Sequence, residues 1–182
     1  MANFTETGIP ELILIQPEVY SDERGYFFES FKQDEYTAQL QVNSFIQENE
    51  SKSTYGVLRG LHYQVAPFEQ AKLVRVVKGK VLDVVVDIRR DSAQFGQHFS
   101  TELTEDNKQQ LYIPRGLAHG YITLSESAIF QYKIDAIYSP EHETGIRYDD
   151  PDLAIDWCIP LSEIVVSSRD QLLPSFRQFS NR

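Results

Sequence analysis

Apolar side chains recur at every second position between residues 80 and 88, where they are Leu82, Val84, Val86 and Ile88. Asp83 and Asp87 fall between them, and therefore on the opposite face of an extended chain. A period of two residues is that of a β-strand with one buried and one solvated face. The pattern predicts a half-buried strand at this point of the chain.

Similar but shorter patterns surround this strand. The expected strands lie at residues 11–16, 26–31, 45–49, 70–77, 111–113, 117–124 and 127–135. Residues 22–25 and 114–116 are expected turns, and 78–80 is expected to form a tight hairpin that joins 70–77 to the strand at 80–88. Only residues 32–41 have helical spacing, through Tyr36 and Leu40. Many short strands with turns about every ten residues indicate an all-β sandwich or barrel.

The strand expected at residues 127–135 has a clear inner face, formed by Ala128, Phe130, Tyr132 and Ile134. Tyr132 is therefore predicted to point inward. In the strand at 45–49, Gln47 and Asn49 share a face, where their amides are either ligand contacts or ordinary surface groups.

Length and charge narrow the class of protein. A chain of 182 residues is expected to form one domain that spans residues 1–182. The net charge of −10 argues against a nucleic-acid partner, because the phosphate backbone selects basic surfaces. No apolar run reaches the ~20 residues of a membrane helix, and residues 1–8 lack a secretion signal, so we expect a soluble, cytoplasmic protein without a membrane partner. Cys158, beside Trp157, is expected to be an inert buried thiol.

Candidate chemistry gathers in residues 56–77, which hold Arg59, His62 and Lys72. A metal site on neighbouring strands would need a third ligand beside His62 and His119, and the residue two after His62 is Gln64. Ligand counting therefore favours a site without metal.

A metal-free pocket with these residues suits proton transfer at a carbon next to a carbonyl. A histidine is a base of near-neutral pKa, and a lysine or arginine can meet the enolate oxygen as it forms. A tyrosine such as Tyr132 can return the proton from the other side. On these residues alone, the alternative that the histidines and the tyrosine are hydrogen-bonded packing residues stays open.

Longer motifs then occur in a fixed order. They are GVLRGLHYQ, QAKLVRVVKGKVLDVVVDIRRDS, FGQH, QLYIPRGLAHGY and YSPEHETGIRYDDPDLAIDW. In sequence and spacing they resemble the dTDP-4-dehydrorhamnose 3,5-epimerase family, over about residues 22–170. The resemblance implies a cupin-like jelly roll with a few short peripheral helices, a homodimer, and no metal or cofactor. It also implies epimerisation of a dTDP-4-keto-6-deoxy sugar at both carbons next to the ketone, on the way to dTDP-L-rhamnose.

The resemblance also assigns roles to residues. His62 corresponds to the proton acceptor, Tyr132 to the proton donor and Asp170 to the carboxylate that orients the base. Lys72 and His119 fall where the family contacts the sugar and the enolate, and Arg59 where it contacts phosphate. The remaining substrate contacts implied are Arg24, Glu29, Gln47, Asn49, Tyr138, which would stack on thymine, Glu143 and Arg169.

Arg169 departs from the lysine that is usual in the family, which keeps the charge but changes the shape of the contact. Two alternatives to a double epimerase also stay open. One is a single-carbon epimerase of a related dTDP-4-keto sugar. The other is a non-catalytic sugar-nucleotide-binding cupin, which is disfavoured because His62, Tyr132 and Asp170 are all present.

Overall fold

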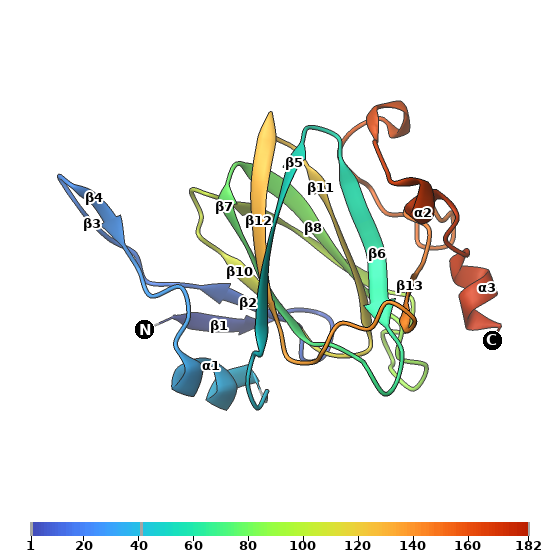
Figure 1. Cartoon of the computed structure of the whole chain (residues 1–182), viewed down its shortest axis with the longest axis horizontal. Helices are drawn as coiled ribbons and strands as arrows, with labels where there is room; N and C mark the ends of the chain where they lie inside the picture. Colours follow the sequence, from blue (N-terminus) through green and yellow to red (C-terminus); the bar gives the residue numbers. More distant parts are fainter. Residues whose placement is uncertain (1, 41, 182) are drawn as a thin grey trace.

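Two antiparallel β-sheets pack face to face in this computed structural model, which describes residues 2–40 and 42–181 (Figure 1). The six-stranded sheet has the order β1-β2-β10-β7-β12-β5, and the five-stranded sheet has the order β13-β6-β11-β8-β9. A separate hairpin, β3-β4, projects away from the sandwich. The fold is the expected all-β, cupin-like jelly roll.

The strands are short, as the turn spacing predicted. Their bounds are β1 Asn3–Glu6, β2 Ile13–Gln16, β3 Tyr20–Asp22, β4 Gly25–Phe27, β5 Gln47–Thr54, β6 Leu58–Gln64, β7 Lys72–Lys78, β8 Lys80–Asp87, β9 His98–Thr104, β10 Gln110–Ile113, β11 Leu117–Thr123, β12 Ser127–Ile134 and β13 Glu143–Gly145.

Helices are few and peripheral. The expected helix is α1 (Gln33–Leu40), which buries Tyr36 and Leu40, and the end of that prediction, Gln41, lies outside the described residues. The C-terminal region adds a 3-10 turn, η1 (Leu161–Glu163), and two short helices, α2 (Ser168–Gln171) and α3 (Phe176–Ser180). Within the described residues, no helix is both long and apolar enough to cross a membrane.

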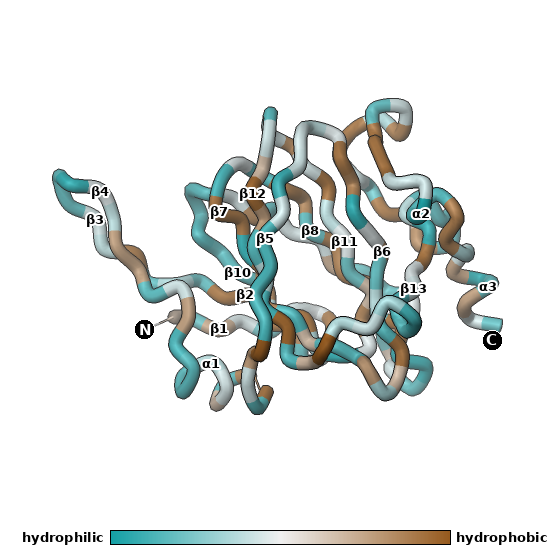
Figure 2. The backbone as a smooth tube through the Cα atoms, viewed as in Figure 1, coloured by the Kyte–Doolittle hydropathy of each residue, from teal (hydrophilic) through white to brown (hydrophobic). Residues whose placement is uncertain are grey.

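Strand β8 corrects the prediction of a half-buried strand, because both of its faces are covered. One face points into the sandwich, where Val81 and Val85 join the core between the sheets. The other face packs under the C-terminal segment, where Leu82, Val84 and Val86 join a second core with Trp157. Figure 2 shows hydrophobic segments along both the strands and the C-terminal segment. Asp83 therefore faces the interior rather than solvent, and its exposed fraction is 0%.

Two further expectations were wrong. Residues 78–80 do not form a hairpin, since β7 pairs with β10 and β12 while β8 pairs with β11 and β9, so Gly79 is a corner between sheets. Cys158 is exposed rather than buried. Its φ is 63°, so the chain turns sharply after the buried Trp157 and the two side chains diverge.

Candidate active site

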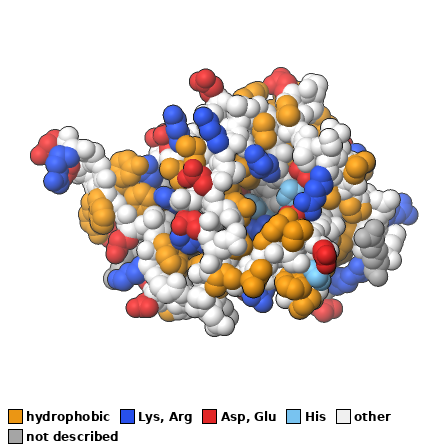
Figure 3. Space-filling model, in the orientation of Figure 1, with side chains coloured by type: hydrophobic (Ala, Val, Ile, Leu, Met, Phe, Trp, Pro, Cys, Tyr) orange, Lys and Arg blue, Asp and Glu red, His pale blue; other side chains and the backbone are white. Residues whose placement is uncertain are grey.

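A cavity of about 630 Å³ lies between the two sheets and opens between β5 and β6. Figure 3 shows the hollow near the centre of this face, with histidine side chains inside it. Most of the residues expected at the site line this cavity: Gln47, Asn49, Arg59, His62, Lys72, His119, Tyr132, Tyr138, Glu143, Arg169 and Asp170.

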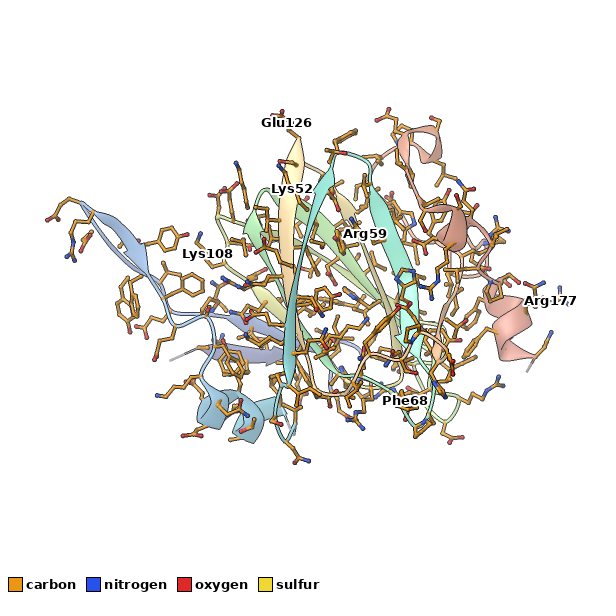
Figure 4. All side chains as sticks on the ribbon, in the orientation of Figure 1. Lys52, Arg59, Phe68, Lys108, Glu126 and Arg177 are labelled. Atoms are coloured by element: carbon orange, nitrogen blue, oxygen red, sulfur yellow. The ribbon has the colours of Figure 1, made fainter. Side chains whose placement is uncertain are left out.

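A bulge in β6 turns two of these side chains inward. Tyr121 pairs with Arg59 and His119 with His62, so three residues of β6 span the length of two in β11. The extra residue lies where Gly60 has a φ of 137° and where an added Cβ would come within 2.4 Å of Gly120 Cα. Arg59 reaches toward β5, where its Nε donates to Ser53 Oγ at 3.1 Å (Figure 4). The bulge places a guanidinium and an imidazole on the same wall of the cavity.

His62 forms a dyad with Asp170. The distance from Nε2 to Oδ1 is 2.7 Å, and α2 fixes the carboxylate because the Ser167 hydroxyl caps the Asp170 amide at 3.0 Å. Burial alone would raise the pKa of Asp170, but the hydrogen bond with His62 and its neighbours lowers the pKa overall. An ionised Asp170 holds the imidazole proton on Nε2, and Nδ1 is then the nitrogen that can accept a proton.

A second dyad lies beside the first, because His119 is the cross-strand neighbour of His62. His119 Nε2 lies 2.9 Å from Asp83 Oδ2, and both residues are buried. Burial lowers the pKa of His119 even though Asp83 opposes the shift, so the imidazole is neutral at pH 7. Asp83 was not among the expected site residues. An aspartate inside an apolar strand was the signal that could have identified it.

Lys72 enters the cavity from the start of β7. Burial lowers its pKa, while the charges of Glu143 and Asp83 work in the opposite direction. A lysine in this setting is a cation with few waters around it, suited to meet developing negative charge on a ligand.

Tyr132 faces this wall from the other sheet, since it lies on β12 and pairs with Asn49 of β5. The prediction that it points inward is confirmed. Burial raises its pKa, so the phenol keeps its proton at neutral pH. The cavity therefore has an imidazole on one wall and a phenol on the opposite wall.

Three polar residues join two segments at one side of the cavity. The Tyr138 hydroxyl donates to Glu143 Oε2 at 2.9 Å, and Arg169 Nη1 lies 2.5 Å from the same oxygen. The hydrogen bond to Glu143 raises the pKa of Tyr138, and the ion pair with Glu143 raises that of Arg169. These contacts connect the loop after β12 to α2.

Arg24 and Glu29 are the expected site residues that do not line the cavity. Arg24 lies in the turn of the β3-β4 hairpin, where its guanidinium pairs with Asp22, and its side chain is 83% exposed. Glu29 follows the same hairpin. In this chain the hairpin points away from the sandwich (Figure 1).

No group of three or more histidine, cysteine or acidic side chains is arranged to hold a metal ion among residues 2–40 and 42–181. Both imidazoles of the cavity use Nε2 to hold a carboxylate. The arrangement can take a proton from one face of a bound molecule, supply one to the other, and stabilise negative charge between them.

Comparisons with known proteins point in the same direction. The family model for dTDP-4-dehydrorhamnose 3,5-epimerase matches residues 6–178. The dTDP-4-dehydrorhamnose 3,5-epimerase of Pseudomonas aeruginosa is 47% identical over 92% of each chain.

Solved structures agree as well. An epimerase of Legionella pneumophila, in complex with dTDP-4-keto-L-rhamnose, superposes with a TM-score of 0.93 at 45% identity, over 97% of this chain and 94% of that one. A 3′-monoepimerase of Streptomyces bikiniensis, in complex with dTDP-quinovose, has a TM-score of 0.89 at 30% identity, over 96% and 88% of the two chains.

Proposed function

The chain belongs to the dTDP-4-dehydrorhamnose 3,5-epimerase family, and from this premise we propose that it epimerises dTDP-4-dehydro-6-deoxy-D-glucose at C3 and C5 to dTDP-4-dehydro-L-rhamnose. The observation that carries the proposal is the His62–Asp170 dyad on one wall of the cavity and Tyr132 on the other. Inversion at a carbon next to a ketone needs a proton to leave one face and another to arrive on the opposite face.

In this mechanism His62 Nδ1 removes the proton at each carbon in turn. The Nε2–H bond to Asp170 holds the ring and stabilises the imidazolium that forms. Tyr132, protonated at neutral pH, then returns a proton to the opposite face.

The enolate oxygen meets Lys72 between these two groups. Loss of a positioned donor of this kind typically costs about 3 kcal/mol of barrier. The neutral His119, with Nε2–H donated to Asp83, presents Nδ1 to the sugar as a hydrogen-bond acceptor. Each of these steps uses side chains of the chain itself.

The nucleotide end of the substrate lies toward the cavity mouth. Arg59 and Arg169 are the cations there for the diphosphate, and Tyr138 offers a ring on which thymine can stack. Gln47 and Asn49, linked to each other at 2.8 Å, add amide groups on the edge strand β5.

The functional unit in this proposal is a homodimer in which the β3-β4 hairpin of one protomer reaches the cavity of its partner. Three aromatic side chains of the hairpin are more than half exposed: Tyr20, Tyr26 and Phe27. Such exposure on a projecting element is typical of a surface that another chain covers. In this arrangement, Arg24 and Glu29 of one protomer would reach the cavity of the partner, although they do not reach the cavity of their own chain.

The similarity to a 3′-monoepimerase makes inversion of a single carbon the second candidate. Proton NMR of the 4-keto substrate in deuterated water distinguishes the two. The double epimerase exchanges the protons at C3 and C5, whereas the single-carbon enzyme exchanges one of them.

His62→Ala should abolish exchange at both carbons, because one base serves the same sugar face. Loss of a general base costs about 100-fold or more. Near wild-type exchange by this variant would remove His62 from the mechanism, and absence of exchange with the wild-type protein would refute the epimerase itself.

A further inference from the structure

Gln64 is a buried side chain near the cavity that makes three hydrogen bonds and has no role in the reaction described above. It is the last residue of β6, two positions after His62, and it is 7% exposed. It does not line the cavity. Its amide nevertheless makes three hydrogen bonds, all to backbone groups of two loops.

The bonds hold the chain on both sides of Tyr138. Gln64 Oε1 accepts from the Ser139 amide at 2.7 Å, and Nε2 donates to the Ile137 carbonyl at 3.3 Å. Nε2 also donates to the Phe68 carbonyl at 2.5 Å, which ties the same amide to the loop between β6 and β7.

No strand ladder holds the backbone where Tyr138 lies. Strand β12 ends at Ile134 and β13 begins at Glu143. Backbone bonds to other segments hold the two ends of the stretch between them, where the Asp135 amide donates to the Ala71 carbonyl and the His142 carbonyl accepts from the Val65 amide. Nearer to Tyr138, side chains supply the hydrogen bonds. A buried amide that satisfies both neighbours of one residue fixes the direction of that residue's side chain.

The backbone of Gln64 also positions Glu143, the residue that accepts the hydrogen bond of the Tyr138 hydroxyl. Glu143 pairs with Gln64 across the β13-β6 ladder, and it accepts the Tyr138 hydroxyl at 2.9 Å. Gln64 therefore sets both the loop that carries the tyrosine and the strand that carries its acceptor.

From this geometry we infer that Gln64 is a positioning residue for nucleotide recognition, acting through Tyr138 rather than on the reacting carbons. The inference rests on the proposed function, in which Tyr138 stacks on thymine. It separates the roles of two residues on one strand: His62 serves the chemistry and Gln64 serves the affinity for the nucleotide.

The test measures binding of dTDP alone by calorimetry, in a cycle of Gln64→Met and Tyr138→Ala. Methionine keeps the length of the side chain and removes its three hydrogen bonds. Unsatisfied buried backbone groups should release the loop, and we expect the Kd for dTDP to rise about tenfold. In the Tyr138→Ala background, the same change should raise Kd less than about twofold, because the effect passes through the missing ring.

Steady-state rates add a second readout. Gln64→Met should raise KM for the 4-keto substrate about tenfold and leave kcat within about threefold, since the His62–Asp170 dyad is untouched. A matched control is Gln131→Met on β12, which removes an amide that accepts a hydrogen bond from Arg75 of β7 and should change neither Kd nor KM.

Gln64→Glu provides a second variant should the methionine variant fold poorly. It keeps an acceptor for Ser139 but places a carboxylate against two carbonyl oxygens, so it should also weaken dTDP binding, and again only when Tyr138 is present. Equal losses with and without Tyr138, or a fall in kcat at constant KM, would overturn the inference. Failure of the wild-type protein to bind dTDP would instead refute the proposed function.

Discussion

His62 and His119 both hold a carboxylate through Nε2, yet their surroundings give them different chemistry. His119 and Asp83 are buried together, and burial lowers the pKa of that imidazole. The His62 side chain is 24% exposed to the cavity, while its partner Asp170 is 5% exposed. Both rings line the cavity, but His62 is the more exposed of the two, which suits the base that we propose, whereas the buried His119 suits a neutral contact.

Tyr132 separates removal of a proton from inversion of a carbon. Tyr132→Phe keeps the packing of the ring and deletes the donor, so a proton that His62 removes can return only from the face that it left. We expect continued exchange with deuterated water at the carbon that Tyr132 serves, with retained configuration. NMR of the exchanged sugar measures both quantities in one sample.

The opposite result would be equally clear. A doubly inverted product formed by Tyr132→Phe at the wild-type rate would make this tyrosine a packing residue, and another group would have to supply the proton. Tyr121→Phe is a suitable control, because that tyrosine also lines the cavity but its hydroxyl is bonded to Ser51 at 2.9 Å.

The lowered pKa of Lys72 leads us to expect a fall in kcat/KM on the basic side of its pH profile. Burial lowers its pKa, so the ammonium loses its proton at a lower pH than the 10.5 of a free lysine. If the cation stabilises the enolate as we propose, kcat/KM should fall as pH rises through the lowered pKa. Lys72→Arg should keep a cation at every pH tested and remove this limb, at the cost of a lower rate from changed geometry. An identical basic limb in the two proteins would assign it to another group.

At the level of single elements, strands with clear alternation, such as β8 and β12, were predictable and strand partners were not. Strand β9 (His98–Thr104) was not expected, and the strand expected at residues 26–31 ends at Phe27. The inner face of β12 followed from its two-residue period, and it placed Tyr132 correctly. The same reasoning failed at β8, where both faces are buried. The alternating aspartates predicted a solvated face, but Asp83 is bonded to His119 and Asp87 to Arg89, so both carboxylates are buried. The prediction of a hairpin at Gly79 also failed, because a turn signal in the sequence does not indicate whether the next strand joins the same sheet.

The bulge in β6 is an element that the sequence pattern did not reveal, although the site depends on it. Regular alternation cannot place Arg59 and His62, three positions apart, on one face of a strand. The two side chains share the cavity because one residue is added at Gly60.

Gly60→Ala should therefore cost stability and activity together. The φ of 137° disfavours any side chain, and the new Cβ would meet Gly120 Cα at 2.4 Å. We expect a loss of about 1–3 kcal/mol in the free energy of unfolding, measured with denaturant, and a lower kcat as His62 shifts. Gly8→Ala is the matched control, since a Cβ at Gly8 meets nothing within 4 Å. A wild-type kcat for a stable Gly60→Ala protein would show that the bulge does not set the position of His62.

At the scale of the whole molecule, the site is assembled from distant parts of the chain. His62 and Asp170 are 108 residues apart, and α2 brings the aspartate to β6 from the C-terminal cover. Residue patterns could not predict this contact. The family resemblance implied it, and the dyad geometry agrees with that assignment. Arg24 and Glu29 stay predictions, because their own chain does not bring them to the cavity.

Heterodimers of two inactive variants test whether the hairpin acts in the partner's cavity. If it does, a dimer of Arg24→Ala with His62→Ala has one cavity with intact His62 and an intact hairpin from the other protomer. The second cavity carries both changes. With each protomer given a different affinity tag, the purified heterodimer should show about half of the wild-type rate, as expected when a two-fold dimer has one complete site.

The decisive control pairs a wild-type protomer with one that carries both changes. When the hairpin crosses between protomers, the wild-type cavity receives the altered hairpin and the altered cavity lacks its base, so this dimer should show about half of the rate of the Arg24→Ala homodimer. When each hairpin instead serves its own chain, the outcomes reverse: the mixed single variants have no complete site and the wild-type protomer keeps one. The two heterodimers contain the same two substitutions in different arrangements, so a difference between their rates measures only which chain supplies Arg24.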